Sequence, residues 1–196
     1  MQMQALHIIG EEHQSLAAIL HAIRYMLKEV AAGKLQADLK LFQAMVHYLD
    51  AYAEKRHHPK EDLLFEYLVR RTGEGADALA ALAVQHRAAP ERIAALQQAL
   101  EAYLADSVRF ADFARAFDAY ADFYRSHMLL EEETVLPLVR KYLTPADWNA
   151  VDAEFRAEMA SNSGADGKAE DFSGLFSRLV NAAPAPIGFG SGPFTG

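Results

Sequence analysis

Apolar side chains recur every three or four residues along four long stretches of the chain, and this spacing predicts four amphipathic helices. We expect these helices over about residues 3–32, 38–71, 76–105 and 107–142. Each apolar stripe is interrupted by a histidine at a position that faces the core: His13, His57, His86 and His127. Burying a polar side chain is costly unless a partner compensates it, so four inward-facing histidines require a shared partner.

Glycine and proline fall between and after these stretches and delimit the predicted elements. Gly33 ends the first helix, and Thr144-Pro145 begins a fifth helix of about residues 145–160. Trp148 in this fifth helix is expected to pack against the rest of the protein. Residues 161–167 are predicted to form a linker and residues 172–181 a last short helix.

Short connections between long helices favour an all-α, up-down-up-down four-helix bundle. The sequence predicts this bundle over residues 1–143, a C-terminal helical extension over 144–182 and a flexible tail over 183–196. Pro59 and Pro90 lie inside predicted helices, where each removes a backbone hydrogen bond, so we expect the helix to kink or loosen at both.

Composition narrows the range of functions. The net charge of −8 argues against a nucleic-acid partner, which would require a basic face. The chain has no cysteine, which excludes disulfides, thiolate catalysis and thiolate metal sites. No apolar run reaches the roughly 20 residues that span a bilayer, and no signal peptide is recognised, so a cytoplasmic protein without a membrane partner is expected.

The four histidines and two glutamates are predicted to meet at one depth of the bundle. His57 and Glu61 are four residues apart, as are His127 and Glu131, so each pair lies on one helix face. In an up-down bundle, the first and third helices begin where the second and fourth end. His13, His86, Glu61 and Glu131 then lie about ten residues, or roughly 15 Å, from that end, and His57 and His127 lie one turn further in. The predicted metal ligands are His13, His57, Glu61, His86, His127 and Glu131.

Nitrogen and carboxylate ligands without sulfur suit iron, manganese or zinc, and the mixture of histidine and carboxylate favours non-haem iron. Two further residues are weaker candidates. Glu132 is the alternative if the helix register differs by one residue from that of Glu131. His58 points about 100° away from His57 on an ideal helix, so we expect it to support a ligand or to face solvent, unless Pro59 changes the local geometry.

Other residues near these positions have simpler interpretations. Glu54 and His57 form a Glu-x-x-His pair of the kind found in ferritin-like sites, but such sites require two pairs and the chain has one. Tyr120 and Tyr124 precede His127 on the same stripe. They are expected to pack in the core, with a hydrogen bond to a ligand as the alternative.

Over residues 5–142 the chain resembles the hemerythrin-like, or HHE cation-binding, family. The matching segments are Glu12-His13, His57-His58-Pro59-Lys60-Glu61, His86, and His127 to Glu133 with Pro137. The resemblance implies a di-iron centre, with two irons per chain bridged by an oxo or hydroxo group and by Glu61 and Glu131. The four histidines would then be terminal ligands. Zinc or manganese are alternative metals.

The chain departs from the oxygen-carrying hemerythrins at one position. Those proteins have a second histidine in the third helix, four residues after the first, and here that position is Pro90. His58 is one candidate for the missing nitrogen, and an additional open coordination position is the other possibility. Reversible oxygen storage is therefore not the leading expectation.

The sequence leaves three functional hypotheses. The first is a non-haem di-iron protein that senses or handles oxygen, nitric oxide or iron, with a small diatomic ligand as its partner. The second is a di-iron oxidase or peroxidase-like enzyme. The third is a metal-free helical interaction module, which would tolerate His86→Leu, whereas a metal site would lose metal and folding free energy together.

Overall fold

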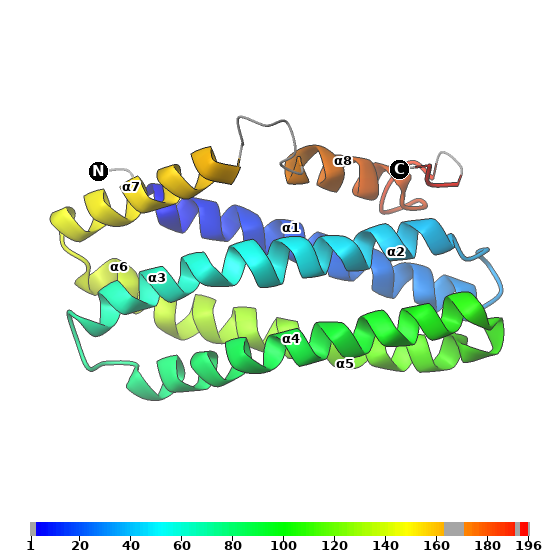
Figure 1. Cartoon of the computed structure of the whole chain (residues 1–196), viewed down its shortest axis with the longest axis horizontal. Coiled ribbons are helices and arrows are strands. Elements are labelled where there is room, and N and C mark those ends of the chain that lie inside the picture. The colour runs from blue at the N-terminus through cyan, green and yellow to red at the C-terminus, as the bar shows by residue number, and fades with distance from the viewer. Residues whose placement is uncertain (1–2, 163–170, 191–192, 196) are drawn as a thin grey trace.

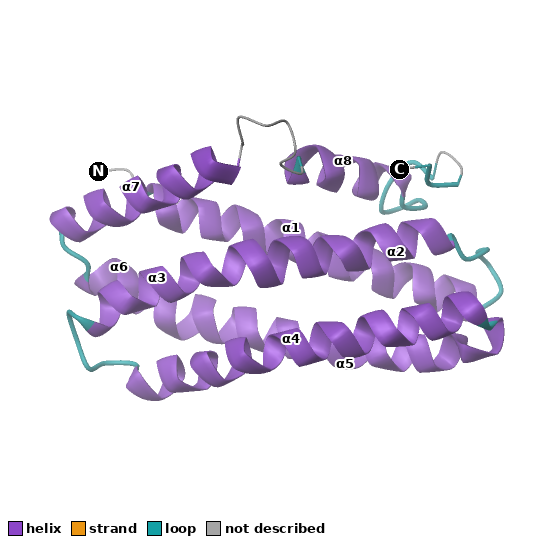
Figure 2. Cartoon of the chain, viewed as in Figure 1, coloured by secondary structure: helices purple, strands orange, loops and turns teal. Residues whose placement is uncertain are grey.

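The computed structural model describes residues 3–162, 171–190 and 193–195, and every secondary-structure element in these ranges is helical. Four long helical segments lie side by side (Figures 1 and 2), and two further helices lie along one side of them. The first segment is α1 (Gln4–Ala31) and the third is α4 (Ala76–Ala105). The second segment comprises α2 (Leu39–Tyr48), the π-helix η1 (Leu49–His57) and α3 (His58–Val69). The fourth comprises the 3₁₀-helix η2 (Ser107–Arg109), α5 (Phe110–Leu130), the π-helix η3 (Glu131–Val135) and α6 (Leu136–Tyr142).

The two π-helices widen the backbone turn just before a proline. The His58 N–H donates to the carbonyl of Ala53, and the Leu136 N–H donates to that of Glu131, each five residues earlier. Proline has no N–H, and its ring collides with the carbonyl four residues before it. In both segments the proline therefore lies in the first turn of a new α-helix, which follows a single stretch of wider helix.

The predicted helix boundaries agree with the structure within a few residues, and two internal expectations are modified. The loosening expected at Pro59 lies before it, over the whole of η1. α4 continues as one α-helix through Pro90, where the sequence predicts a second loosening. The first two residues of the predicted linker 161–167 belong to α7 (Pro145–Asn162). The rest of the predicted linker lies outside the described residues.

The apolar core consists of two clusters. In α1, Ile9 belongs to one cluster and Leu16 to the other, and His13 lies between them. In α4, Leu82 and Ile93 belong to different clusters in the same way, on either side of His86. A polar layer thus separates two apolar halves at the depth where the sequence places the candidate ligands.

α7 and α8 (Phe172–Ala182) cover different parts of the long segments. Trp148 of α7 is 2% exposed and packs in the same cluster as Ile9 and Leu82, which confirms the expected packing. The predicted tail contacts the start of the second segment, since the Phe194 N–H donates at 2.7 Å to Oδ2 of Asp38, the N-cap residue of α2. Among the described residues, no helix has the length and apolarity needed to cross a membrane.

Candidate metal centre

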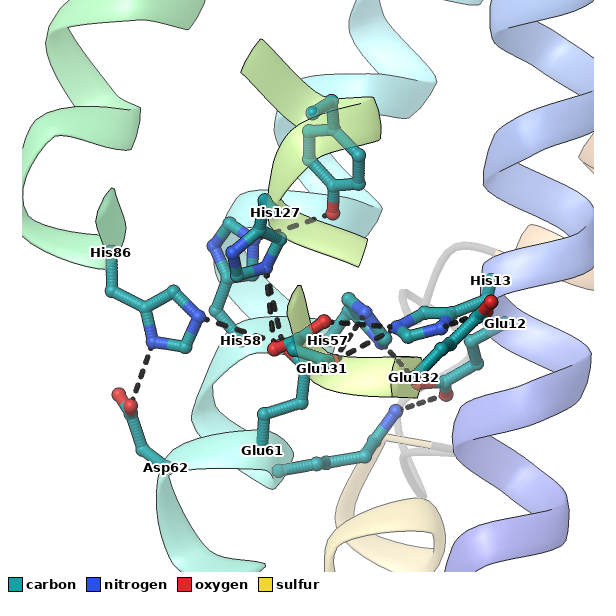
Figure 3. Close-up of polar contacts among 12 residues, drawn as sticks. Glu12, His13, His57, His58, Glu61, Asp62, His86, His127, Glu131 and Glu132 are labelled. Atoms are coloured by element: carbon teal, nitrogen blue, oxygen red, sulfur yellow. Dashed lines mark hydrogen bonds and ion pairs between the residues drawn. The ribbon is translucent and has the colours of Figure 1, made fainter. Parts of the chain in front are cut away.

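Seven side chains from all four long segments converge in the polar layer (Figure 3). His13 comes from α1, His57 from the end of η1, His86 from α4 and His127 from α5. Glu61 is fully buried in α3, and Glu131 is fully buried at the start of η3. The structure therefore brings together all six residues predicted as ligands, Glu131 through its contacts with His13 and His127, and also His58, one of the two weaker candidates.

Glu61 lies between two groups of histidines. Its Oε1 lies 3.0 Å from His13 Nε2 and 2.9 Å from His57 Nε2. Its Oε2 lies 3.6 Å from His86 Nε2 and 3.7 Å from His127 Nε2. Each oxygen of this carboxylate thus faces a different pair of imidazole nitrogens.

Glu131 connects the same two groups from another helix. Its Oε2 lies 3.3 Å from His13 Nε2, and its Oε1 lies 3.4 Å from His127 Nε2. We call the space faced by His13, His57, Glu61 Oε1 and Glu131 Oε2 the first position. The second position is faced by His58, His86, His127, Glu61 Oε2 and Glu131 Oε1.

His58 lies inside the site, contrary to the expectation that it supports a ligand from outside or faces solvent. It is 5% exposed, and its ring stacks on that of His86 with centroids 4.4 Å apart. His57 ends the π-helix η1 and His58 begins α3. The wider turn makes the rotation between neighbouring residues smaller than in an α-helix, which favours an inward direction for both. Tyr124 is buried in the core as expected, and its hydroxyl lies 3.3 Å from His58 Nε2.

All five histidines have an acceptor oxygen beside their other ring nitrogen. The Nδ1 atoms lie 2.7–3.1 Å from these oxygens, contributed by Glu132 for His13, Glu12 for His57, Glu54 for His58, Asp62 for His86 and Gln85 for His127. An Nδ1–H that donates to such an oxygen leaves Nε2 as the ring atom available to a metal. In His13, His57, His86 and His127, Nε2 is the nitrogen that faces the two shared carboxylates. His58 Nε2 lies 3.3 Å from the Tyr124 hydroxyl.

Several of the inward-facing atoms are buried without a hydrogen-bond partner. They are Nε2 of His57, His86 and His127, Oε2 of Glu61 and both oxygens of Glu131. Buried polar atoms are almost always satisfied in native proteins, so a cluster of six needs an explanation. A cation in the centre would satisfy nitrogen lone pairs and carboxylate oxygens at the same time, and the residues present fit that role.

Mutual stabilisation of the charged forms shifts the pKa values of the metal-free site. Burial opposes protonation of His13, but contacts with Glu131 and Glu61 outweigh it and raise the pKa of His13 to about 10. The same balance raises the pKa of His57 to about 9 through Glu61 and Glu12. It raises the pKa of His86 to about 10 through Asp62 and Glu61.

The two buried carboxyls differ from each other. Burial raises the pKa of Glu131, and the neighbouring charge of Glu61 raises it further. For Glu61 burial acts in the same direction, but the surrounding histidines overcome it and hold its pKa well below the usual value. Without a metal, the site therefore holds protons on His13, His57 and His86 and has one firmly ionised carboxylate, whereas burial lowers the pKa of His58.

Sequence reasoning does not identify most of the residues that hold the histidines in place. Glu12 is 6% exposed and accepts from His57 Nδ1, the Tyr52 hydroxyl and Lys60 Nζ. Its only signal in the sequence is its place beside His13 in a matching segment. Glu132, the alternative ligand, contacts His13 Nδ1 at 2.9 Å on the side away from the centre.

Comparison with known proteins agrees with this geometry. A family model described as the hemerythrin HHE cation binding domain matches residues 4–139, more than two thirds of the chain. The match contains all five inward-facing histidines and both glutamates. No curated protein and no solved structure matches the chain.

Proposed function

The chain belongs to the hemerythrin HHE cation binding domain family, and we propose that it is a non-haem di-iron protein that senses or handles oxygen, nitric oxide or iron. In this proposal the four long segments act as an up-down-up-down bundle that holds the metal pair in its polar layer. The ligands are His13, His57, His58, Glu61, His86, His127 and Glu131.

The observation that carries the proposal is the arrangement of the two carboxylates. Glu61 and Glu131 each direct one oxygen to the first position and the other to the second. A single ion would leave one half of each carboxylate, and the histidines beside it, buried and uncompensated. Two ions bridged by both carboxylates would compensate every inward-facing atom.

The donor set supports iron. It contains imidazole nitrogen and carboxylate oxygen without sulfur, which suits iron, manganese and zinc, and mixed histidine and carboxylate ligation with open positions is typical of non-haem iron. When bound, iron at such a centre supplies open coordination positions and redox chemistry for a small diatomic ligand.

The two positions differ in how many protein donors they offer. The first has two histidines and the second has three, while the carboxylates serve both. The first position therefore retains more room for an external ligand. His58 supplies the third nitrogen of the second position, in place of the histidine that Pro90 replaces in this chain.

The test is elemental analysis of protein grown with iron and purified without chelator, together with its ultraviolet and visible spectrum. We expect two irons per chain and charge-transfer bands of a bridged ferric pair in the wild type. His86→Leu should lose metal, whereas His21→Gln, which changes an exposed histidine of α1, should retain it. Two results would refute the proposal: a folded wild-type protein that contains no metal, or a His86→Leu variant that retains its full metal content. Either result would favour the hypothesis of a metal-free helical interaction module.

A further inference from the structure

The helix α8 follows the part of the chain that the family model matches and lies along α1 and α2 (Figure 1). Its buried face consists of Phe172, Leu175 and Leu179. Phe172 is the first residue of this helix and lies near the π-helix η1, which carries His57 at its end.

Phe172 packs against two tyrosines and one arginine of the second long segment. Its ring centroid lies 5.2 Å from that of Tyr52 and 6.0 Å from that of Tyr48. The guanidinium of Arg56 lies over the Phe172 ring, 4.5 Å from its centroid. Since Tyr52 and Arg56 both belong to η1, Phe172 fixes the outer face of this π-helix.

Tyr52 continues the connection toward the metal centre. Its hydroxyl donates to Glu12 Oε1 at 3.1 Å, and Glu12 Oε2 accepts from His57 Nδ1 at 2.7 Å. Lys60 Nζ also donates to Glu12 Oε1, so this carboxylate is held from two sides. Three direct contacts thus join Phe172 to a histidine of the first position.

Local hydrogen bonds fix the start of α8 and with it the place of Phe172. Asp171 caps the helix by accepting from the Gly174 N–H at 2.9 Å. A Cβ at position 174 would lie 2.2 Å from Asp171 Oδ2, so glycine permits this close cap. The cap sets where the helix begins and therefore where the Phe172 ring lies.

We propose that Phe172 is a positioning residue for His57, acting through Tyr52 and Glu12. This inference rests on the proposed metal-binding function. Through this connection a helix outside the matched family domain controls the imidazole of the position that has more room for an external ligand. The partner of a ligating histidine sets the orientation and basicity of its ring, so a displaced Glu12 weakens the metal bond made by His57.

Four single variants of the full chain separate positioning from general packing. Phe172→Ala removes the ring that contacts Tyr52, and Tyr52→Phe retains that packing but removes the donor to Glu12. Phe176→Ala is the matched control, because Phe176 lies on the same helix but contacts Tyr48, with centroids 6.1 Å apart. Phe172→Tyr keeps an aromatic ring and should restore the wild-type behaviour.

The first measurement needs no metal. In the metal-free protein, the proton resonance of the His57 Nδ1–H reports its hydrogen bond to Glu12. We expect Phe172→Ala and Tyr52→Phe to shift this resonance and to speed its exchange with water, whereas Phe176→Ala leaves it unchanged. An unchanged resonance in both variants, or an equal change in the control, would overturn the inference. If Phe172→Ala does not fold, Phe172→Leu, which removes the ring but keeps an apolar side chain, takes its place.

The second measurement is the loss of Fe²⁺ from loaded protein to a chelator. Phe172→Ala and Tyr52→Phe should accelerate the release of one iron by about tenfold, the lower end of the effect of removing such a partner. The release of the other iron should not change. Equal acceleration of both irons would refute a specific action on His57. If the wild type binds no iron, the proposed function fails, while the His57 resonance still tests the positioning role.

Discussion

Glu131→Gln should act in opposite directions on the metal-free and the metal-loaded protein. The amide keeps the volume of a fully buried side chain whose oxygens have no hydrogen-bond partner. In the metal-free protein the carboxyl lies beside the Glu61 charge, and both this charge and burial raise its pKa. Removing its ionisation relieves this repulsion, so the melting temperature without metal should stay the same or rise.

With metal present the same change removes an oxygen donor from both positions, because Oε2 faces His13 and Oε1 faces His127. Losing only the partner of a ligating residue costs at least about tenfold in metal affinity. The loss of a direct ligand should reduce the metal affinity at least as much, and a tenfold loss of affinity corresponds to about 1.4 kcal/mol. Over two positions the metal-linked stabilisation should fall by about 3 kcal/mol or more. In a chain of this length, that is a loss of roughly 6–12 °C in melting temperature.

The assay is thermal unfolding followed by circular dichroism, with and without excess Fe²⁺ under anaerobic conditions. Glu133→Gln is the control, since it makes the same substitution at an exposed position of the same π-helix. It should behave as the wild type in both conditions. If Glu131→Gln lowers the melting temperature equally with and without metal, Glu131 has a structural role and the reasoning is wrong.

Three further predictions concern protons, stoichiometry and the C-terminal helices. The raised pKa values of His13, His57 and His86, about 9 to 10, mean that the metal-free protein holds protons at pH 7 that a metal must displace. Metal titration in weak buffer with a pH indicator should therefore release protons, and affinity should increase with pH. The same raised pKa values stabilise the metal-free fold fully below about pH 6.5, and this stabilisation is lost as the pH rises through 9 to 10. Measuring the free energy of unfolding of the metal-free protein as a function of pH would show this loss. His58→Gln should reduce binding at the second position and bring the metal content toward one per chain, while His21→Gln retains two; equal metal contents would exclude His58 as a ligand. Asp147→Ala should lower the melting temperature by roughly 2–8 °C without changing metal content, because it removes a cap worth about 1–2 kcal/mol. In the wild type this carboxylate accepts hydrogen bonds from the N–H and hydroxyl of Thr144 and from two guanidinium nitrogens of Arg71. A changed metal content in Asp147→Ala would show that α7 affects the metal centre and would contradict the prediction.

Periodicity identifies the all-helical class, and with the up-down arrangement expected from short connections it predicts the convergence of six side chains. The alternating spacing puts His13, His86 and His127 on apolar stripes, and helix length gives their depth. Both are properties of a single helix, so they can be read before the helices are packed. The match to the family model confirms the resemblance drawn from the spaced histidines and glutamates. Metal ligation by these residues remains a prediction.

The residues that hold the histidines could not be predicted in this way. Glu12 supports His57 from 45 residues away, and Gln85 supports His127 from 42 residues away. Such pairs depend on how one helix is rotated and shifted against another, and the hydrophobic pattern of each helix defines its buried face only within a broad sector. Exposed acids are common on helices, so Asp62 beside His86 has no distinguishing signal either.

The π-helix η1 helps to explain why the inward-facing side chains differ from those expected on ideal helices. An α-helical turn would rotate His58 about 100° from His57 and leave the second position with two nitrogens, because Pro90 stands where the third helix would offer another. The wider turn of η1 brings both consecutive histidines inward, and Pro59 favours this geometry because it cannot continue the preceding hydrogen-bond ladder. In the proposed centre, His58 would then supply the nitrogen that Pro90 cannot offer. Replacing Pro59 would remove the local reason for η1 to end where it does, and the first side chain to leave the site would be His58.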